Sequence, residues 1–115
     1  MVTTLIVNGS PYGSELPYNA LRLASALLVK EHWVELFFLG DGVHTARSGQ
    51  DPRGAHASLE DMLKELIGNG AVVTLCGTCC QVRGVTADDI VDGARLGTIH
   101  ALAALVARSD RVVSF

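Results

Sequence analysis

Residues 2–30 read VTTLIVNGSPYGSELPYNALRLASALLVK, and this stretch decides the fold. Its β-branched, apolar beginning (2–7) predicts a buried strand, and the Asn8-Gly9-Ser10-Pro11 sequence that follows predicts a turn. From Glu15 to Lys30, apolar residues recur every three or four positions, which predicts a helix with one apolar face. A strand, a turn and a helix in this order form the repeating unit of an α/β protein.

The same alternation continues along the rest of the chain. Strands are predicted at 33–39, 71–75 and 111–115, with a brief strand or extended connection at 91–94, and helices at 58–67 and 96–108. The strands are almost continuously apolar, as strands covered on both faces are. We therefore expect a mostly parallel sheet of four to five strands covered by helices, in a single domain spanning residues 1–115.

The composition excludes several classes of protein. The chain has 115 residues, a formal net charge of -3 and a pI of about 5.7, so no general attraction to nucleic acid is expected. Its longest apolar run, 101–107, is far shorter than the roughly 20 residues of a membrane helix. The first residues show no basic, secretion-type signal, so we expect a cytoplasmic protein. Only 18% of residues are charged, against about 25% in an average domain, which favours a homo-oligomer.

Three cysteines cluster directly after the predicted strand 71–75, at Cys76, Cys79 and Cys80. Ligands of parallel α/β sheets bind at the carboxyl ends of the strands, so this position favours chemistry. Three interpretations remain open. The cysteines pack in the core, they hold zinc in a site shared between subunits, because one chain offers too few ligands, or the Cys76-x-x-Cys79 spacing serves redox or sulfur-transfer chemistry.

An active thiol has to be a thiolate, and the local sequence suits that requirement. Cys76 lies where a strand passes into a helical turn, and a helix N-terminus lowers a thiol pKa. Arg83 adds positive charge, and Gly77 lets the backbone approach a ligand closely. We therefore expect Cys76 to be ionised and accessible.

A second candidate site is the loop after the first strand, which carries Asn8, Gly9, Ser10 and Tyr12. A small, hydroxyl-rich loop before a helix can hold an anion. The alternative is a tight turn followed by a helix cap at Ser14 or Glu15, with Tyr12 packed over the end of the sheet. Two histidines, His44 and His56, are interpreted as ordinary exposed residues.

The whole chain resembles the YchN-like proteins of the DsrE/DsrF-like superfamily. The resemblance lies in VNGSPYGSELPYNALRLASAL, LCGTCCQVRGV, IVDGARLGTIHALA and VVSF. The second segment carries the family's Cys-x-Thr-Cys as Cys76, Thr78 and Cys79, whereas Cys80 is additional. The resemblance implies a flavodoxin-like three-layer sandwich and a homo-oligomer, either a trimer or a hexamer.

Sulfur-relay members of this superfamily, similar to DsrE and TusD, carry one active cysteine eight residues ahead of the glycine of an Arg-Gly pair. Cys76 stands eight residues ahead of Gly84, which follows Arg83. The resemblance therefore implies that Cys76 bears a persulfide and exchanges sulfur with a donor or acceptor protein. Such transfer needs no metal and no other cofactor, and Cys79 would act as a neighbouring or resolving thiol. The alternative from another class is a non-enzymatic ligand-binding or partner-binding oligomer with structural cysteines.

Overall fold

Five parallel strands form one sheet in the order β4-β3-β2-β1-β5 in the computed structural model, which describes residues 1–54 and 58–115. This arrangement confirms the predicted parallel sheet. One residue named in the sequence analysis, His56, lies outside the described residues. The strands are β1 (Val2–Val7), β2 (Trp33–Phe38), β3 (Val72–Cys76), β4 (Arg95–Gly97) and β5 (Arg111–Ser114). The helices are α1 (Leu16–Val29), α2 (Leu59–Gly68), α3 (Gly77–Gln81) and α4 (Ile99–Arg108), with the short 3-10 helices η1 (Gly40–Ala46) and η2 (Ala87–Asp89).

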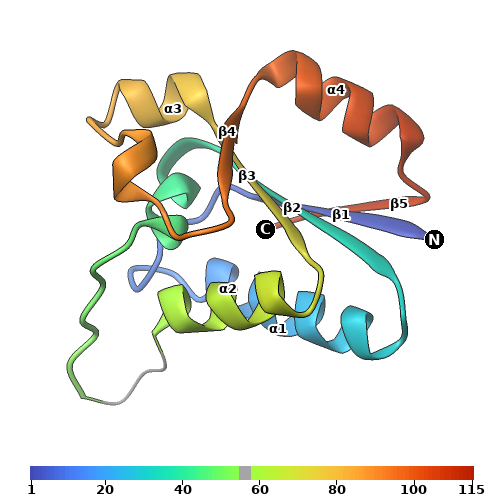
Figure 1. The fold of residues 1–115 in the computed structure, drawn as a ribbon, viewed down its shortest axis with the longest axis horizontal. Coiled ribbons are helices and arrows are strands. Elements are labelled where there is room, and N and C mark those ends of the chain that lie inside the picture. Colours follow the sequence, from blue (N-terminus) through green and yellow to red (C-terminus); the bar gives the residue numbers. More distant parts are fainter. Residues whose placement is uncertain (55–57) are drawn as a thin grey trace.

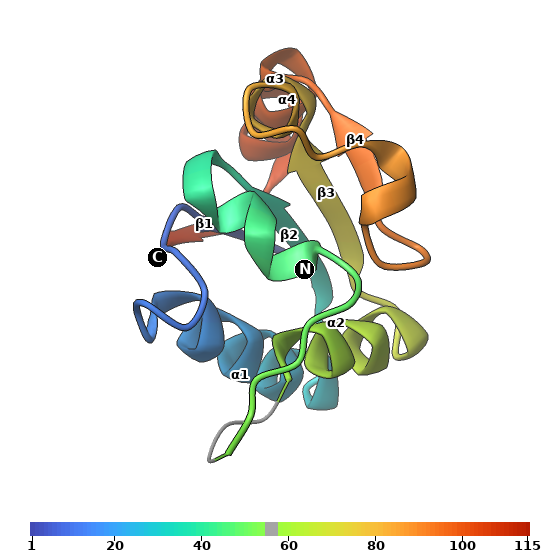
Figure 2. The same ribbon diagram turned by 90° about the vertical axis from the view of Figure 1, so that its left-hand side faces the viewer.

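Helices cover both faces of the sheet, as expected for a three-layer α/β sandwich. Figures 1 and 2 show α1 and α2 on one face and α4 on the other, with α3 at the end of β3. Successive strand residues point to opposite faces. The larger core therefore collects alternate residues of each strand on the α1 and α2 side, namely Leu5, Val7, Leu36, Phe38, Val73 and Leu75. A smaller core under α4 contains Phe37, Cys76, Leu102 and Leu105.

The strand order brings three loops to one edge of the sheet. From β1 to β4 each new strand is added beside the previous one, and α4 then returns the chain to β5 on the other side of β1. Parallel strands all end at the same edge, so the segments after β1, β2 and β3 meet there. This edge holds the first loop, η1 and the cysteines.

The last helix begins later than its sequence suggests. Leu96 and Gly97 were predicted to be helical, but they belong to β4, where Gly97 pairs with Cys76. A Cβ atom on Gly97 would lie 2.6 Å from the Thr74 side chain, so only glycine fits in this strand. Thr98 then caps α4 by accepting the Ala101 N–H at 3.1 Å, and this cap sets the start of the helix.

The most apolar stretch of the sequence forms part of α4, a helix of 10 residues. A helix needs about 20 residues to cross the hydrocarbon core of a bilayer. In the ranges 1–54 and 58–115, no helix has the length and apolar character to span a membrane.

Candidate functional site

The end of β3 places Cys76 in two elements at once. Cys76 is the last residue of the strand and also the N-cap of α3, where its Sγ accepts the backbone N–H of Cys79 at 3.3 Å. Its side chain lies on the α4 side of the sheet beside Phe37 and retains 7% of its surface exposed. Cys76 is therefore a buried cysteine in the single chain, contrary to the expectation of an accessible thiol.

Cys79 lies one turn further along α3 and is half-buried. The Cys76 and Cys79 side chains lie close enough to change each other's pKa, and the backbone N–H of Gly40 acts on the Cys79 thiol from the neighbouring loop. Arg83 adds a nearby positive charge. The structure therefore brings Cys76, Cys79 and Arg83 together, as the sequence motif implied.

The two thiols have opposite pKa shifts. Burial raises the pKa of Cys76, and the interaction of its thiol with the Cys79 side chain raises it further. The backbone N–H groups of Cys79 and Thr78 lower this pKa, but by less. Burial also acts to raise the pKa of Cys79, but the Cys76 hydrogen bond, the Gly40 N–H and the Arg83 charge outweigh it and lower that pKa overall. The prediction that Cys76 has the lowered pKa is therefore wrong. Of the two thiols, Cys79 therefore ionises more readily than Cys76.

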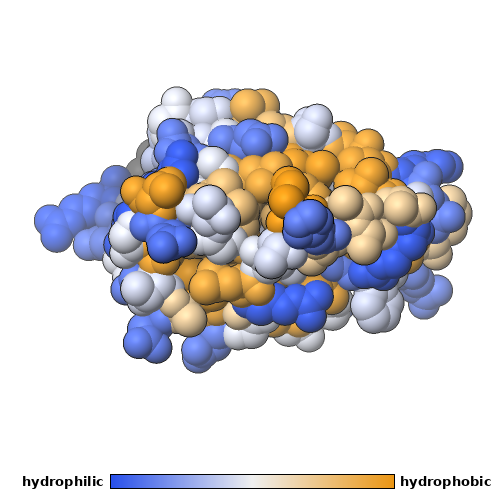
Figure 3. All heavy atoms as spheres, turned by 90° about the horizontal axis from the view of Figure 1, so that it is seen from above, coloured by the Kyte–Doolittle hydropathy of each residue, from blue (hydrophilic) through white to orange (hydrophobic). Residues whose placement is uncertain are grey.

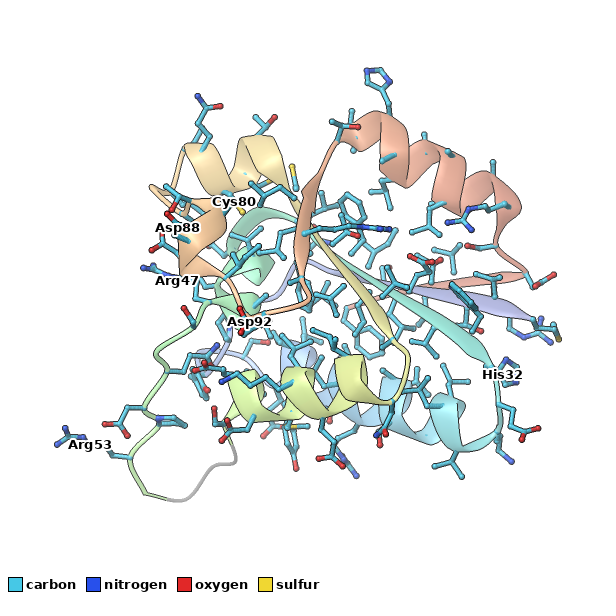
Figure 4. The ribbon with its side chains drawn as sticks, in the orientation of Figure 1. His32, Arg47, Arg53, Cys80, Asp88 and Asp92 are labelled. Atoms are coloured by element: carbon cyan, nitrogen blue, oxygen red, sulfur yellow. The ribbon has the colours of Figure 1, made fainter. Side chains whose placement is uncertain are left out.

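Cys80 has a different environment from the other two cysteines. Only 1% of its surface is exposed, it packs in the larger core, and burial raises the pKa of its thiol. Figure 4 shows its side chain on the inner side of α3. The packing interpretation thus holds for Cys80, as it does for most buried cysteines.

Arg83 connects the cysteines with the loop after β2. Its Nη1 donates to the carbonyl oxygen of Cys79 at 3.0 Å, and its Nε donates to Asp41 Oδ1 at 2.9 Å. This hydrogen bond and the Arg83 charge hold the pKa of the Asp41 carboxyl below its usual value. Asp41 orients Arg83, and our sequence reasoning missed it. The signal was available, because Asp41 directly follows the second strand at the same edge of the sheet.

Among the described residues, Ser10 makes the hydrogen bond that connects the first loop to Asp41. Its hydroxyl lies 3.5 Å from Asp41 Oδ2, a weak contact, whereas Tyr12 turns away and donates to Gln50. The Tyr12 hydroxyl also accepts the Leu59 N–H at 3.1 Å, which ties the loop to the start of α2. The backbone of Tyr12 has a φ of 64°, uncommon for a residue with a side chain.

The rest of the first loop forms a turn that packs against the start of α1. The Asn8 N–H bonds to the Phe115 carbonyl, and the Ser14 side chain accepts the Leu16 N–H at 3.1 Å. A Cβ on Gly9 would lie 2.8 Å from Leu16, so the loop packs directly on α1. These contacts agree with a tight turn, but Glu15, the N-cap residue of α1, makes no side-chain cap hydrogen bond.

The glycines and the threonine of the cysteine motif shape the backbone. Gly77 passes close to β4, since a Cβ atom there would lie 3.2 Å from the Gly97 carbonyl. Gly84 has a φ of 69°, which allows the chain to turn after α3. Thr78 is exposed and acts through its backbone N–H, which faces Cys76.

In the part of the chain that the structure describes, no group of three or more His, Cys, Asp or Glu side chains is arranged to hold a metal ion. His44 is half-buried in η1 rather than exposed as interpreted from the sequence, and it lies close enough to Asp41 to help lower the pKa of that carboxyl. The observed site is therefore a dithiol with one arginine and one aspartate.

Together these features define a parallel α/β protein with a paired-thiol site at the carboxyl end of its central strands. The sequence model of the DsrE/DsrF-like family matches residues 1–115, and the chain belongs to this family. It is 44% identical over 115 residues to an uncharacterized protein of Methanocaldococcus jannaschii, with 100% of both chains covered. It is 37% identical over 113 residues to YchN of Escherichia coli, with 96% of each chain covered.

The fold agrees with that relationship. The crystal structure of E. coli YchN superimposes with a TM-score of 0.92 at 38% identity and covers 100% of both chains. A more distant relative is the protein named sulfurtransferase TusD of Cronobacter sakazakii, 31% identical over 125 residues, with 97% of this chain and 98% of that one covered. The predicted YchN-like relationship and α/β fold are thereby confirmed.

Proposed function

We propose that this protein relays sulfane sulfur through the Cys76–Cys79 pair. The observation that carries the proposal is the contact between two cysteines at the end of β3, where the Cys79 N–H donates to Cys76 Sγ and Arg83 donates to the Cys79 carbonyl oxygen. A thiolate is the nucleophile in sulfur exchange. The relative named sulfurtransferase TusD supports the same class of chemistry.

In the proposed transfer, Cys76 receives the sulfur. Its proton moves to the neighbouring Cys79 thiolate, and the negative charge on Cys76 is then stabilised by the N–H groups of Cys79 and Thr78. The Cys76 thiolate attacks the sulfane sulfur of a donor, an S–S bond forms, and the donor's own S–S bond breaks. The donor leaves with the electron pair of that bond, as a thiolate or as sulfite. A thiolate of an acceptor protein removes the sulfur by the same step in reverse.

Thiol redox chemistry is the second candidate, favoured by the contact between the two cysteines. Attack of Cys79 on the Sγ of persulfidated Cys76 would form a Cys76–Cys79 disulfide and release the outer sulfur as hydrosulfide. All three cysteines are free thiols in the structure.

We also propose that the protein acts as a homo-oligomer, a trimer or a hexamer. Several large apolar side chains are exposed on the α4 face and on β5, including Leu96, Ile99, Val106, Val112 and Val113. Figure 3 shows hydrophobic residues gathered over this side of the molecule. Exposed apolar patches of this kind mark protein contacts. A sulfur donor or acceptor protein would be a second partner, and neither nucleic acid nor membrane is part of the proposal.

The alternative is a binding module in which the cysteines are structural. Titration with a thiol reagent under native conditions separates the two. One fast-reacting thiol at neutral pH supports chemistry, whereas three slow thiols support the binding module.

The test of the relay is intact-mass measurement after incubation with thiosulfate. We expect a gain of one sulfur atom in the wild type and in Cys80→Ser, and its loss in Cys76→Ser. Cys79→Ser is expected to retain the sulfur on Cys76 for longer, because the release of hydrosulfide is blocked. An adduct that persists in Cys76→Ser, or that never forms in the folded wild type, rejects the proposal.

A further inference from the structure

A pocket of about 300 Å³ opens on the α4 face of the sheet, next to the small core in which Cys76 packs with Phe37 and Leu105. It lies between α4 and strands β2, β3 and β4, and it is lined by both charged and apolar side chains. Its volume is at the lower end of the range for small-molecule sites. A ligand of amino-acid size would fill it.

A buried carboxylate forms one wall of this pocket. Glu35 is 3% exposed, and its Oε2 accepts the indole N–H of Trp33 at 2.8 Å. The same oxygen lies 3.6 Å from Arg108 Nη2, a long contact from a side chain that is 57% exposed. Among the residues that the structure describes, Oε1 accepts no hydrogen bond. Burial of a charge is costly unless it is fully paired, so Glu35 has capacity for a cationic ligand group.

A guanidinium group forms another part of the pocket wall. Arg95 comes from the edge strand β4, and its Nε donates to Thr74 Oγ1 at 3.3 Å. This contact orients the side chain, while its two terminal nitrogens have no protein partner within residues 1–54 and 58–115. A guanidinium group whose terminal nitrogens are free can donate two parallel hydrogen bonds to a carboxylate or another planar acid.

The walls between these groups are apolar. Phe37 and Leu105 line the pocket, together with alanines of α4. Apolar walls of this kind accept a short hydrocarbon chain. We propose that this pocket binds a small amphoteric amine, with its ammonium group on Glu35, its acid group on Arg95 and its aliphatic chain against Phe37 and Leu105. The ammonium group would replace the long contact with Arg108.

Trp33 provides a direct signal for this proposal. It is the single tryptophan of the chain, and its indole donates to the same carboxylate that the ammonium group would contact. We would titrate the full-length protein with β-alanine, γ-aminobutyrate and ε-aminocaproate and follow the Trp33 emission and the indole N–H resonance. A saturable change with at least one of these probes is expected.

Substitutions then assign each end of the ligand. Glu35→Gln keeps an acceptor for Trp33, and both it and Arg95→Gln are expected to weaken the binding of the responding probe by about tenfold or more. Arg22→Gln, on α1 at the opposite face, is the matched control and should bind like the wild type. Hexylamine should depend on Glu35 alone, and caproate on Arg95 alone.

The outcomes are decisive for this pocket and require no reaction of the cysteines. A flat indole signal through the millimolar range, in protein that melts cooperatively, overturns the proposal. That result is also the one expected if a second copy of the chain covers this face. Unchanged binding in either variant, with its fold verified by thermal melting, overturns the amphoteric assignment.

Discussion

The backbone N–H of Cys79 donates to the Sγ of Cys76 at 3.3 Å, so a candidate reactive thiol is also the cap of α3. This relationship predicts different results for two substitutions at one position. Serine also caps helices, so Cys76→Ser should keep the free energy of unfolding close to that of the wild type. Cys76→Ala should lower it by about 1 kcal/mol. Urea denaturation measures both, and an equal loss in the two variants would show that the cap contributes nothing.

Arg83 is expected to control thiol ionisation. Its positive charge lowers the pKa of Cys79, and removal of that charge should raise this pKa. We expect Arg83→Gln to react with iodoacetamide at neutral pH about two- to fivefold more slowly than the wild type, as loss of a partly exposed charge interaction implies. The rate profile against pH should shift to higher pH.

The control for this experiment is Arg53→Gln. Figure 4 shows Arg53 extending from the long loop, and its side chain is 90% exposed. Its substitution should leave the profile unchanged. If Arg83→Gln also leaves it unchanged, the guanidinium group does not tune the thiols.

The contact between η1 and the end of β1 requires glycine at position 42. A Cβ atom on Gly42 would lie 2.2 Å from the Val7 carbonyl oxygen, and the backbone would have to move. We expect Gly42→Ala to lower the free energy of unfolding by about 1–3 kcal/mol. Gly68→Ala is the matched control, because a Cβ atom there meets nothing within 4 Å and alanine favours the helix. Denaturant unfolding of both variants tests the assignment, and equal stability of the two would refute it.

Glu60 is expected to make stability depend on acid pH. Burial alone would raise the pKa of this carboxyl, but the Gln50 N–H and Lys64 lower it below its ordinary value of 4.5. A pKa that is depressed in the folded state adds stability above pH 4.5, and this contribution is lost as the pH falls through the folded-state pKa.

Thermal melting of wild type and Glu60→Gln across the acid range measures this contribution. The wild type should lose more stability than the variant as the solution is acidified, because glutamine does not titrate. Parallel loss in both proteins would mean that Glu60 has the same pKa in the folded and unfolded states.

Much of the fold could be predicted from local pattern. The run 2–7 is a strand with the predicted bounds, and Ser58 caps α2 by accepting the Asp61 N–H, as expected from its place before an apolar-periodic segment. The start of α4 could not be predicted, because Leu96 and Gly97 have helix-like neighbours in sequence. Their strand conformation depends on pairing with β3, far away in the chain.

For the candidate site, the sequence by itself determined that three cysteines follow a strand and that Arg83 lies one turn beyond Cys79. Such features follow from residue order and local periodicity. Only the tertiary structure decided that Asp41 holds Arg83, that Cys79 rather than Cys76 has the lowered pKa, and that Glu35 is buried beneath α4. The reason is that ionisation and burial depend on which atoms replace water around a group, and those atoms come from strands that are distant in sequence.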